Sequence, residues 1–398
     1  MKRLVVCLDG TWNTPDDEGR ATNVVKIMRA VAHRGSDGVD QITFYDKGVG
    51  TGGPLDRIRG GALGRGLDDN VRDGYRFLGN NYSPGDEIYL FGFSRGAFTA
   101  RSLAGLIGAC GLLDKSRLGS LMRAWELYRT PPEKREEAGR RAIRDLADTT
   151  VRIKCIGVWD TVGALGVPIK TLNRFSQAKY KFHDTELGDI VERAFHALAV
   201  DEKRGPFAPT LWQTRKTPAP DGQIVEQVWF PGVHSDVGGG YANPEGYQEH
   251  RLSDLALDWM IKRVGAKTKL AFDRTYLATE IRPSALALMH ESRSAAYTFS
   301  KGFPYQRVIG EVADWVRKFP FPRHNTPEAG EHFVNEMIHQ SVLERFGQSA
   351  PLQKGEKTVE EDYRPESVAA AKDGLAIVGH DGEPVSLSAI AAGASLGL

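Results

Sequence analysis

Short apolar runs alternate with amphipathic, helix-like segments along the first two-thirds of the chain. Runs of four to eight apolar residues predict buried strands, and apolar residues at every third or fourth position predict helices. Strands are predicted at residues 4–8, 41–45, 87–91, 151–159, 190–200 and 223–233. Helices are predicted at residues 23–31, 67–78 and 97–107, and at 118–147 with a break at two prolines. Strands that alternate with helices indicate an α/β fold with a mostly parallel sheet and helices on both faces.

Residues with catalytic chemistry follow these apolar runs directly, so we expect them along one edge of the sheet. Ser94 lies in Gly92-Phe93-Ser94-Arg95-Gly96, between the strand at 87–91 and the helix at 97–107. A tight strand-to-helix turn needs glycine on both sides, because a side chain there would clash. The pattern predicts a nucleophile elbow, in which an oxyanion beside Ser94 would meet the backbone N–H of Arg95.

A serine nucleophile needs a base, most often a histidine whose second ring nitrogen is held by a carboxylate. Of the ten histidines, His234 stands out because it follows the strand at 223–233 and precedes the glycine-rich loop Ser235–Tyr241. A histidine on such a loop can reach a serine at the same sheet edge, so His234 is predicted as the general base. His196 lies within an apolar run, which indicates a core histidine.

Two aspartates compete for the role of the acid. Asp160 follows the long strand at 151–159, and Asp201 ends the next element along the chain. The order serine, aspartate, histidine holds for both. Counting strands favours Asp201, whereas the clean strand-to-loop context favours Asp160. From the residues alone Asp160 is preferred and Asp201 stays the alternative.

A second oxyanion donor is expected from Asp9-Gly10-Thr11, which follows the first strand. The N–H of Gly10 or Thr11 can point inward, because Gly10 lets the backbone come close. We expect Asp9 to shape the turn through side-chain hydrogen bonds.

Two other functions fit some of the same residues. Asp9, Asp160, His234 and Asp236 could together bind a metal ion, which would make the protein a metal-dependent hydrolase. A non-catalytic binding module on a hydrolase fold is the other alternative. The serine mechanism needs neither a metal nor an organic cofactor, and none is expected.

Composition indicates an ordinary globular protein without a polyanionic partner. Of 398 residues, 41% are hydrophobic and 26% charged, and 52 basic residues balance 51 acidic ones, so nucleic acid is not an expected partner. The three cysteines lie among apolar residues, which is typical of a reducing compartment. The basic N-terminus precedes an apolar run too short for a signal peptide or a membrane span. We expect a cytoplasmic protein, compatible with export by a system that needs no signal peptide and with transient membrane contact.

The chain is expected to divide into a catalytic core at 1–262, with a helical insertion at about 113–150, and a mainly helical extension at 263–398. In the insertion, Leu121, Ala124, Trp125 and Tyr128 form an apolar stripe that favours packing over a lid. In the extension, Phe333, Met337 and Val342 are read as a helical stripe. The loops Gly48–Gly53 and Ala164–His183 are expected to shape the pocket.

Four motifs resemble an uncharacterised α/β-hydrolase domain family that includes the catalytic domain of phospholipase effectors of bacterial type VI secretion. These motifs are Leu8-Asp9-Gly10-Thr11-Trp12-Asn13, Gly92-Phe93-Ser94-Arg95-Gly96-Ala97, Gly157-Val158-Trp159-Asp160-Thr161-Val162 and Phe230–Tyr241. The resemblance implies an α/β-hydrolase-like fold, with Ser94 as nucleophile, Asp160 as acid and His234 as base. It also implies hydrolysis of carboxylic esters, with a small-molecule or lipid ester as substrate. Those effectors carry large additional modules, which residues 263–398 do not resemble.

Overall fold

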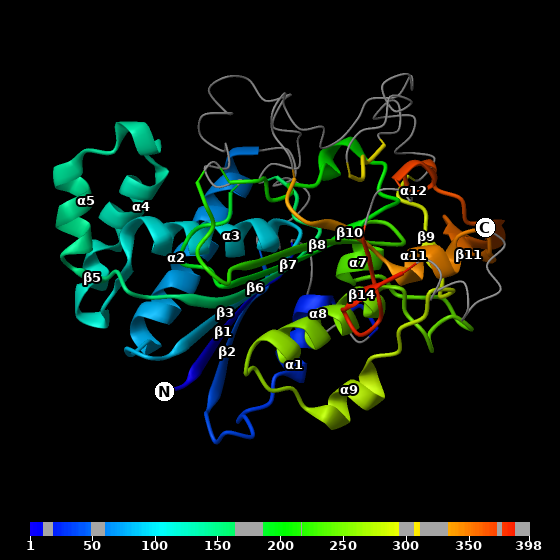
Figure 1. The fold of residues 1–398 in the computed structure, drawn as a ribbon, viewed down its shortest axis with the longest axis horizontal. Coiled ribbons are helices and arrows are strands. Elements are labelled where there is room, and N and C mark those ends of the chain that lie inside the picture. The colour runs from blue at the N-terminus through cyan, green and yellow to red at the C-terminus, as the bar shows by residue number, and fades with distance from the viewer. Residues whose placement is uncertain are drawn as a thin grey trace.

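The computed structural model describes residues 1–10, 19–48, 60–163, 186–215, 217–293, 306–310, 333–371 and 376–386. Within these ranges, nine strands form one sheet in the order β14-β13-β10-β8-β7-β6-β3-β1-β2 (Figure 1). They are β1 (Arg3–Leu8), β2 (Gln41–Asp46), β3 (Glu87–Phe93), β6 (Ile153–Trp159), β7 (Arg193–Ala199), β8 (Ile224–Phe230), β10 (Glu336–His339), β13 (Ala376–Val378) and β14 (Pro384–Val385). All neighbouring strands are parallel except β13 and β14.

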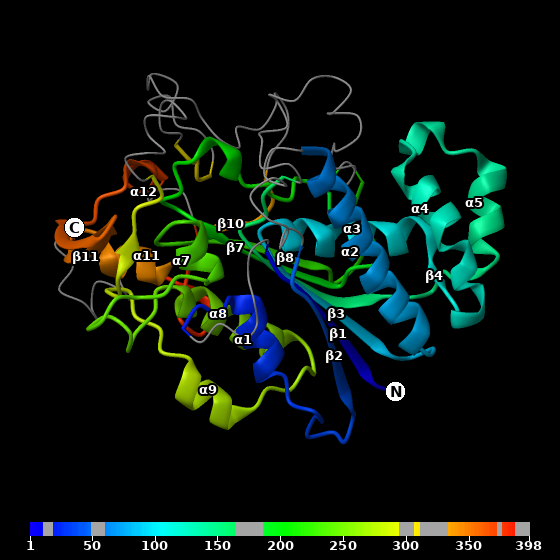
Figure 2. The same cartoon turned by 180° about the vertical axis from the view of Figure 1, so that it is seen from behind.

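Helices cover both faces of this sheet, as Figures 1 and 2 show from opposite sides. One face carries α2 (Gly60–Asn81) and α3 (Arg95–Cys110), and the other carries α1 (Asn23–Ala30) and α8 (Ser253–Lys267), with α9 (Arg274–Glu280) beside α1. The α/β-hydrolase-like architecture expected from the sequence is therefore confirmed. The predicted strands of the first 260 residues or so match observed ones to within a few residues.

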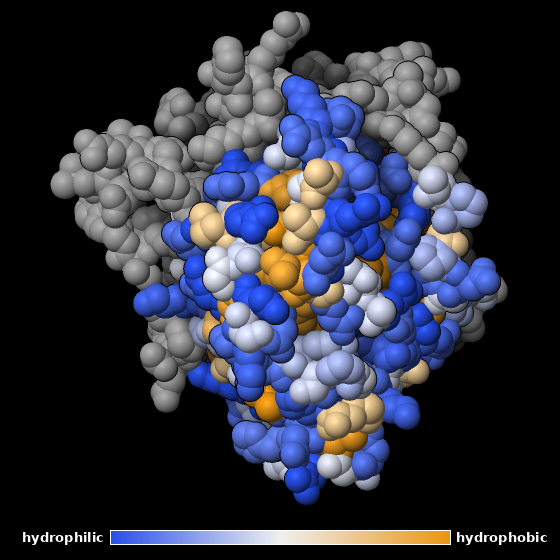
Figure 3. Space-filling view, turned by 90° about the vertical axis from the view of Figure 1, so that its left-hand side faces the viewer, coloured by the Kyte–Doolittle hydropathy of each residue, from blue (hydrophilic) through white to orange (hydrophobic). Residues whose placement is uncertain are grey.

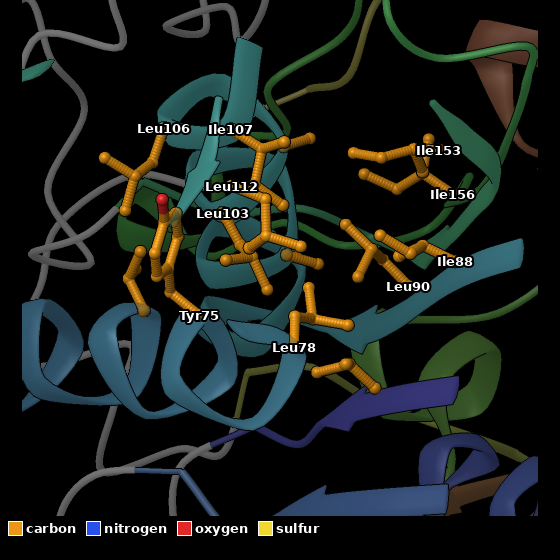
Figure 4. Packing of buried hydrophobic residues seen from close by; sticks show 14 of the residues in the cluster. Tyr75, Leu78, Ile88, Leu90, Leu103, Leu106, Ile107, Leu112, Ile153 and Ile156 are labelled. Atoms are coloured by element: carbon orange, nitrogen blue, oxygen red, sulfur yellow. The ribbon is translucent and has the colours of Figure 1, made fainter. Parts of the chain in front are cut away.

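The central strands are continuous apolar runs because both of their faces are buried. On one face, Leu90 and Ile156 of the sheet pack against Leu103 and Ile107 of α3 (Figure 4). All four side chains are at most 2% exposed. Each such side chain contributes roughly 1.5–3 kcal/mol when it leaves water. This packing fixes α3, and with it the turn before α3, against the sheet.

The insertion lies at one end of the molecule, next to α2 and α3 (Figure 1). It contains α4 (Leu121–Arg129), α5 (Glu137–Arg144) and the short pair β4 (Leu112–Leu113) and β5 (Ala147–Asp148). The predicted stripe of α4 is buried in the same cluster as α3, as packing against the core requires. Figure 3 looks onto this end, where hydrophilic residues dominate and hydrophobic ones are visible between them.

The C-terminal part is mixed rather than mainly helical in the residues described. It contains α11 (Gln340–Arg345), α12 (Glu366–Ala371) and a small sheet of β9 (Met289–His290), β11 (Ser349–Lys354) and β12 (Lys357–Asp362). The expected helical stripe is not formed, because Met337 lies in β10 and only Val342 lies in a helix. The run around Met337 is too short for periodicity to distinguish strand from helix, and pairing with β8 decides for strand. The expected boundary at residue 262 therefore separates β8 from β10, although the two strands are neighbours in one sheet.

None of the helices in the described ranges is both long and apolar enough to cross a bilayer.

Candidate active site

Ser94 lies on a strained turn between β3 and α3. Its backbone angles are φ 58° and ψ −120°, a region that residues other than glycine rarely adopt. A Cβ at Gly92 would lie 2.5 Å from the backbone oxygen of Gly96, and one at Gly96 would lie 2.1 Å from that of Leu8. Gly92 is therefore required for the tight turn into α3, and Gly96 is required for α3 to start this close to β1. Such strain costs about 1–3 kcal/mol and persists only where the surrounding packing enforces it.

His234 begins a short helix, α7 (His234–Gly238), directly after β8. The glycine-rich sequence predicts a loop here, but the backbone forms a short helix. Its last residue, Gly238, lies against the ring of Phe93, where a Cβ would be 1.9 Å from a ring carbon. The same ring packs on the imidazole with centroids 4.6 Å apart, and Phe207 packs on it from another side at 4.8 Å. The two aromatic rings fix the plane of the histidine.

The structure brings Ser94, Asp160 and His234 together from three different strand ends. His234 Nε2 lies 2.8 Å from Ser94 Oγ, and His234 Nδ1 lies 2.6 Å from Asp160 Oδ2. Because a carboxylate only accepts hydrogen bonds, Nδ1 carries the proton and Nε2 is free to accept one from the serine hydroxyl. All three side chains are nearly inaccessible to water, with Ser94 the most exposed residue at 7%. This arrangement can transfer a proton from the hydroxyl to the ring.

The carboxylate of Asp160 is fully buried and held at both oxygens. Oδ1 accepts from the backbone N–H of Ala199 at 3.1 Å and from Arg307 at 2.6 Å. Oδ2 accepts from His234 and from the second guanidinium nitrogen of Arg307, at 2.9 Å. Burial by itself raises the pKa of the Asp160 carboxyl, but Arg307 and His234 outweigh it and hold the pKa well below its usual range. The carboxylate is therefore ionised at neutral pH.

Arg307 is the residue at this site that sequence reasoning missed. It lies far downstream, in the described stretch 306–310, and its side chain is fully buried. Its only signal in the sequence is a lone arginine beside the apolar Val308 and Ile309, a pattern that occurs without any function.

Burial favours the neutral form of His234, against the attraction of the nearby carboxylates. Burial lowers the pKa of His234 below its usual value of 6.5, and the hydrogen bond to Asp160 offsets this only in part. Glu202 accepts from the backbone N–H of His234 at 3.2 Å and is itself paired with Arg204. A neutral imidazole is the form that can act as a base.

Asp201, the alternative acid, lies elsewhere. Its Oδ2 accepts from the backbone N–H of Gly232 at 2.6 Å and from the hydroxyl of Tyr363 at 2.9 Å. Burial raises the pKa of Asp201 to about 6, and these two hydrogen bonds lower it only in part. Of the two candidate aspartates, the structure places Asp160 next to His234.

The first strand ends in a turn that Asp9 organises, as expected. Asp9 Oδ1 accepts from the N–H of Gly10 at 2.6 Å, and Oδ2 accepts from the hydroxyls of Thr22 at 2.6 Å and Tyr45 at 2.9 Å. The N–H of Gly10, predicted as an oxyanion donor, is bound to this carboxylate in the structure, and its role in catalysis stays a prediction. Thr11 lies outside the described residues, as do 49–53 and 164–183 of the two suspected pocket loops. Arg95 is the first residue of α3, where a backbone N–H has no partner within the helix.

The four candidate metal ligands do not converge. Asp9 binds hydroxyls near the first helix, while Asp236 binds the ring of His290, with Oδ1 and Nδ1 2.7 Å apart. Only Asp160 and His234 contact each other. Among the described residues, no group of three or more histidine, cysteine or acidic side chains is arranged to bind a metal ion. His196 is buried and accepts from the N–H of Thr161 at 3.2 Å, as a core histidine does.

Comparison with known proteins assigns the chain to a family. The family model described as "T6SS, Phospholipase effector Tle1-like, catalytic domain" matches residues 2–263. The chain belongs to this family. One relative of this chain is the uncharacterised protein YEL023C of Saccharomyces cerevisiae, which is 31% identical to it over 232 residues. The match covers 52% of this chain and 32% of that protein, so the chain spans about a third of the length of its relative.

Two solved structures are similar at 20% identity. A crystal structure of an uncharacterised protein from Pseudomonas aeruginosa gives a TM-score of 0.42 and covers 71% of this chain and 49% of that one. The structure of the Tle1 effector bound to the VgrG spike from the Type 6 secretion system gives a TM-score of 0.31 and covers 61% of this chain and 51% of that one. The Tle1-like family model ends at residue 263, so Arg307 lies beyond the matched part of the chain.

Proposed function

We propose that this protein is a serine hydrolase that cleaves carboxylic esters, including acyl esters of phospholipids. The observation that carries the proposal is the imidazole of His234, which contacts Ser94 Oγ with one nitrogen and Asp160 with the other. Membership of a phospholipase effector family supports a lipid ester as substrate. The buried, neutral histidine supports a role as general base.

Ser94 is the nucleophile in this mechanism. As its Oγ bonds to the acyl carbon, its proton passes to His234 Nε2, and the negative charge moves to the carbonyl oxygen. The N–H of Arg95, together with the Gly10-Thr11 loop through Thr11, is proposed to bind that oxyanion. Asp160 stabilises the imidazolium without taking its proton. The imidazolium then protonates the leaving alcohol as the carbon–oxygen bond breaks, which leaves an acyl-serine.

Water completes the reaction. His234 removes a proton from water, the hydroxide oxygen bonds to the acyl carbon, and the Ser94 oxygen leaves with the proton returned by His234. A free carboxylic acid is the product.

Family membership also supports delivery through a type VI secretion system and contact with a membrane surface, where a phospholipid substrate would be found.

The test replaces the nucleophile and measures two independent properties. Ser94→Ala is expected to abolish hydrolysis of a short-chain p-nitrophenyl ester and of phospholipid vesicles, and to abolish labelling by a fluorophosphonate. Ser102→Ala changes a buried serine of α3, about two turns after Ser94, and serves as the matched control. It should keep both properties. Ester hydrolysis by Ser94→Ala at a rate close to that of the unmodified protein would contradict the mechanism.

A further inference from the structure

The acid at the candidate site contacts a cation from a distant part of the chain. Arg307 and Asp160 are separated by 147 residues, and neither side chain has any exposed surface. The guanidinium binds both carboxylate oxygens in a fork, at 2.6 and 2.9 Å. A fork of two parallel bonds fixes the plane of the carboxylate as well as its charge. The orientation of Asp160 toward His234 therefore depends on Arg307.

The cation is also needed for charge balance. A buried carboxylate that faces only a neutral imidazole and a backbone N–H takes up a proton readily, because burial disfavours its charged form. A protonated Asp160 would no longer hold the Nδ1 proton of His234 in place. Arg307 supplies the opposite charge within the same buried space.

The same guanidinium supports the other side of the histidine. It donates to the backbone oxygen of Ala199 at 2.6 Å and to that of Phe207 at 2.7 Å. Phe207 is the residue whose ring packs on the imidazole. Arg307 therefore fixes both the carboxylate that His234 contacts and the turn that carries one of its aromatic neighbours.

We propose that Arg307 is a positioning residue for the acyl transfer, which keeps Asp160 ionised and aimed at His234 Nδ1. Because Arg307 lies beyond the matched residues 2–263, the C-terminal part of the chain completes the active site. This inference rests on the proposed function and concerns the same site.

The proposal predicts a change in pH dependence. The groups that face Asp160 are Arg307 and His234, with the neutral ring of His196 nearby. Those that face His234 are Asp160, Glu202 and the more distant Arg204. Removing the Arg307 cation raises the pKa of both Asp160 and His234, because a positive charge nearby disfavours protonation. Each change makes the enzyme lose activity at a higher pH on the acid side of its profile.

The experiment compares Arg307→Gln with Arg307→Lys in the full chain, with a p-nitrophenyl ester as substrate. For Arg307→Gln, kcat should fall about 10- to 100-fold with little change in KM, which is typical of the loss of a positioning group. The acid limb of its kcat/KM profile should move up by about one pH unit or more. Arg307→Lys keeps the charge and loses the fork, so its acid limb should stay in place while kcat falls.

Arg345→Gln is the matched control. Arg345 lies in the same C-terminal part, is 1% exposed, and binds the backbone oxygens of Ala285, Ala287 and Pro351. Its replacement should lower thermal stability without moving the acid limb. An Arg307→Gln profile that keeps its acid limb, with activity reduced equally at every pH as in Arg345→Gln, would overturn the inference.

Two further results keep the outcomes distinct. If Ser94→Ala stays active, the proposed function itself is wrong. If Ser94→Ala is inactive but Arg307→Gln keeps its acid limb, only the proposed role of Arg307 is wrong. If Arg307→Gln does not fold, Arg307→Lys decides. A reduced kcat with an unmoved limb supports the inference, and an unchanged kcat overturns it.

Discussion

Asp160 and Asp201 end neighbouring strands and carry the same carboxyl group, yet their surroundings give them different charge states. Burial raises the pKa of both. At Asp160 a buried guanidinium reverses the effect, whereas the Asp201 carboxylate accepts from a backbone N–H and a tyrosine hydroxyl among the described residues. The partner, more than the depth of burial, therefore decides which carboxylate can stabilise a developing imidazolium.

This difference predicts unequal effects of the same isosteric replacement. Asp160→Asn should lower kcat by about 10³- to 10⁴-fold, because an amide cannot hold the Nδ1 proton or stabilise the imidazolium. Asp201→Asn keeps an oxygen for the Gly232 N–H and should keep activity within about threefold, since it leaves the Ser94 to His234 contact intact. Steady-state kinetics with one soluble ester measure both. Equal losses in the two variants would contradict the assignment of the acid to Asp160 alone.

The environment of His234 predicts the pH profile of the unmodified protein. The base must be neutral, and burial lowers the pKa of His234 from its usual 6.5. The acid limb of kcat/KM should therefore have its midpoint below pH 6.5, so that activity persists into mildly acidic solution. The profile is measured with a non-ionising ester substrate. A midpoint above 6.5 would mean that the attraction of Asp160 outweighs burial.

At the scale of single elements, the position of α3 depends on its first glycine. A Cβ at Gly96 would lie 2.1 Å from the backbone oxygen of Leu8 and 2.5 Å from that of Asp9. These atoms lie at the last residue of β1 and directly after it, and β1 cannot move without disturbing its pairing with β2 and β3. The helix itself would have to shift.

Gly96→Ala should therefore destabilise the protein by about 2–4 kcal/mol and abolish most ester hydrolysis, since the shift displaces Ser94. Gly108→Ala, in the same helix, is the control because its Cβ would meet nothing closer than Ile190 at 3.8 Å. It should stabilise the helix by up to about 1 kcal/mol and keep activity. Thermal unfolding and ester kinetics measure both variants. Similar behaviour of the two would rule out the close approach to β1.

Elements defined by local pattern could be predicted from the sequence, and elements defined by their partners could not. The strand before Ser94 and the helix after it follow from an apolar run, two glycines and a helical period. The strand β10 has four residues and is a strand because β8 provides its partner. The role of Arg307 is harder still to predict from the sequence, because it depends on a carboxylate 147 residues away. Ser94 and His234 have local context that points to chemistry, whereas a lone arginine has none.

At the scale of the whole molecule, the C-terminal part packs against the catalytic core and adds strands to its sheet. β10 extends the sheet next to β8, and Tyr363 binds Asp201 at the end of β7. Glu336 of β10 accepts from Trp229 Nε1 at 3.0 Å and from the N–H of Gly310 at 3.4 Å. Gly310 lies in the short stretch that carries Arg307. The carboxyl group of Glu336 therefore connects β8 and β10 of the sheet to the stretch that carries Arg307, the partner of Asp160.

That carboxyl predicts how the stability of the whole protein depends on pH. Burial raises the pKa of Glu336 from 4.5 to about 7, so the folded protein holds its proton more tightly than the unfolded chain does. The free energy of unfolding should therefore fall as the pH rises from about 4.5 to about 7, with a contribution from this group of about 2 kcal/mol. Glu336→Gln keeps the oxygen that accepts both hydrogen bonds and removes the titration. Denaturant unfolding at pH 5 and pH 8 should show a smaller loss of stability in Glu336→Gln than in the unmodified protein. Glu360→Gln, on the exposed strand β12, should show the unmodified loss. A loss of the same size in all three proteins would mean that Glu336 titrates normally and that water reaches the contact between β8 and β10.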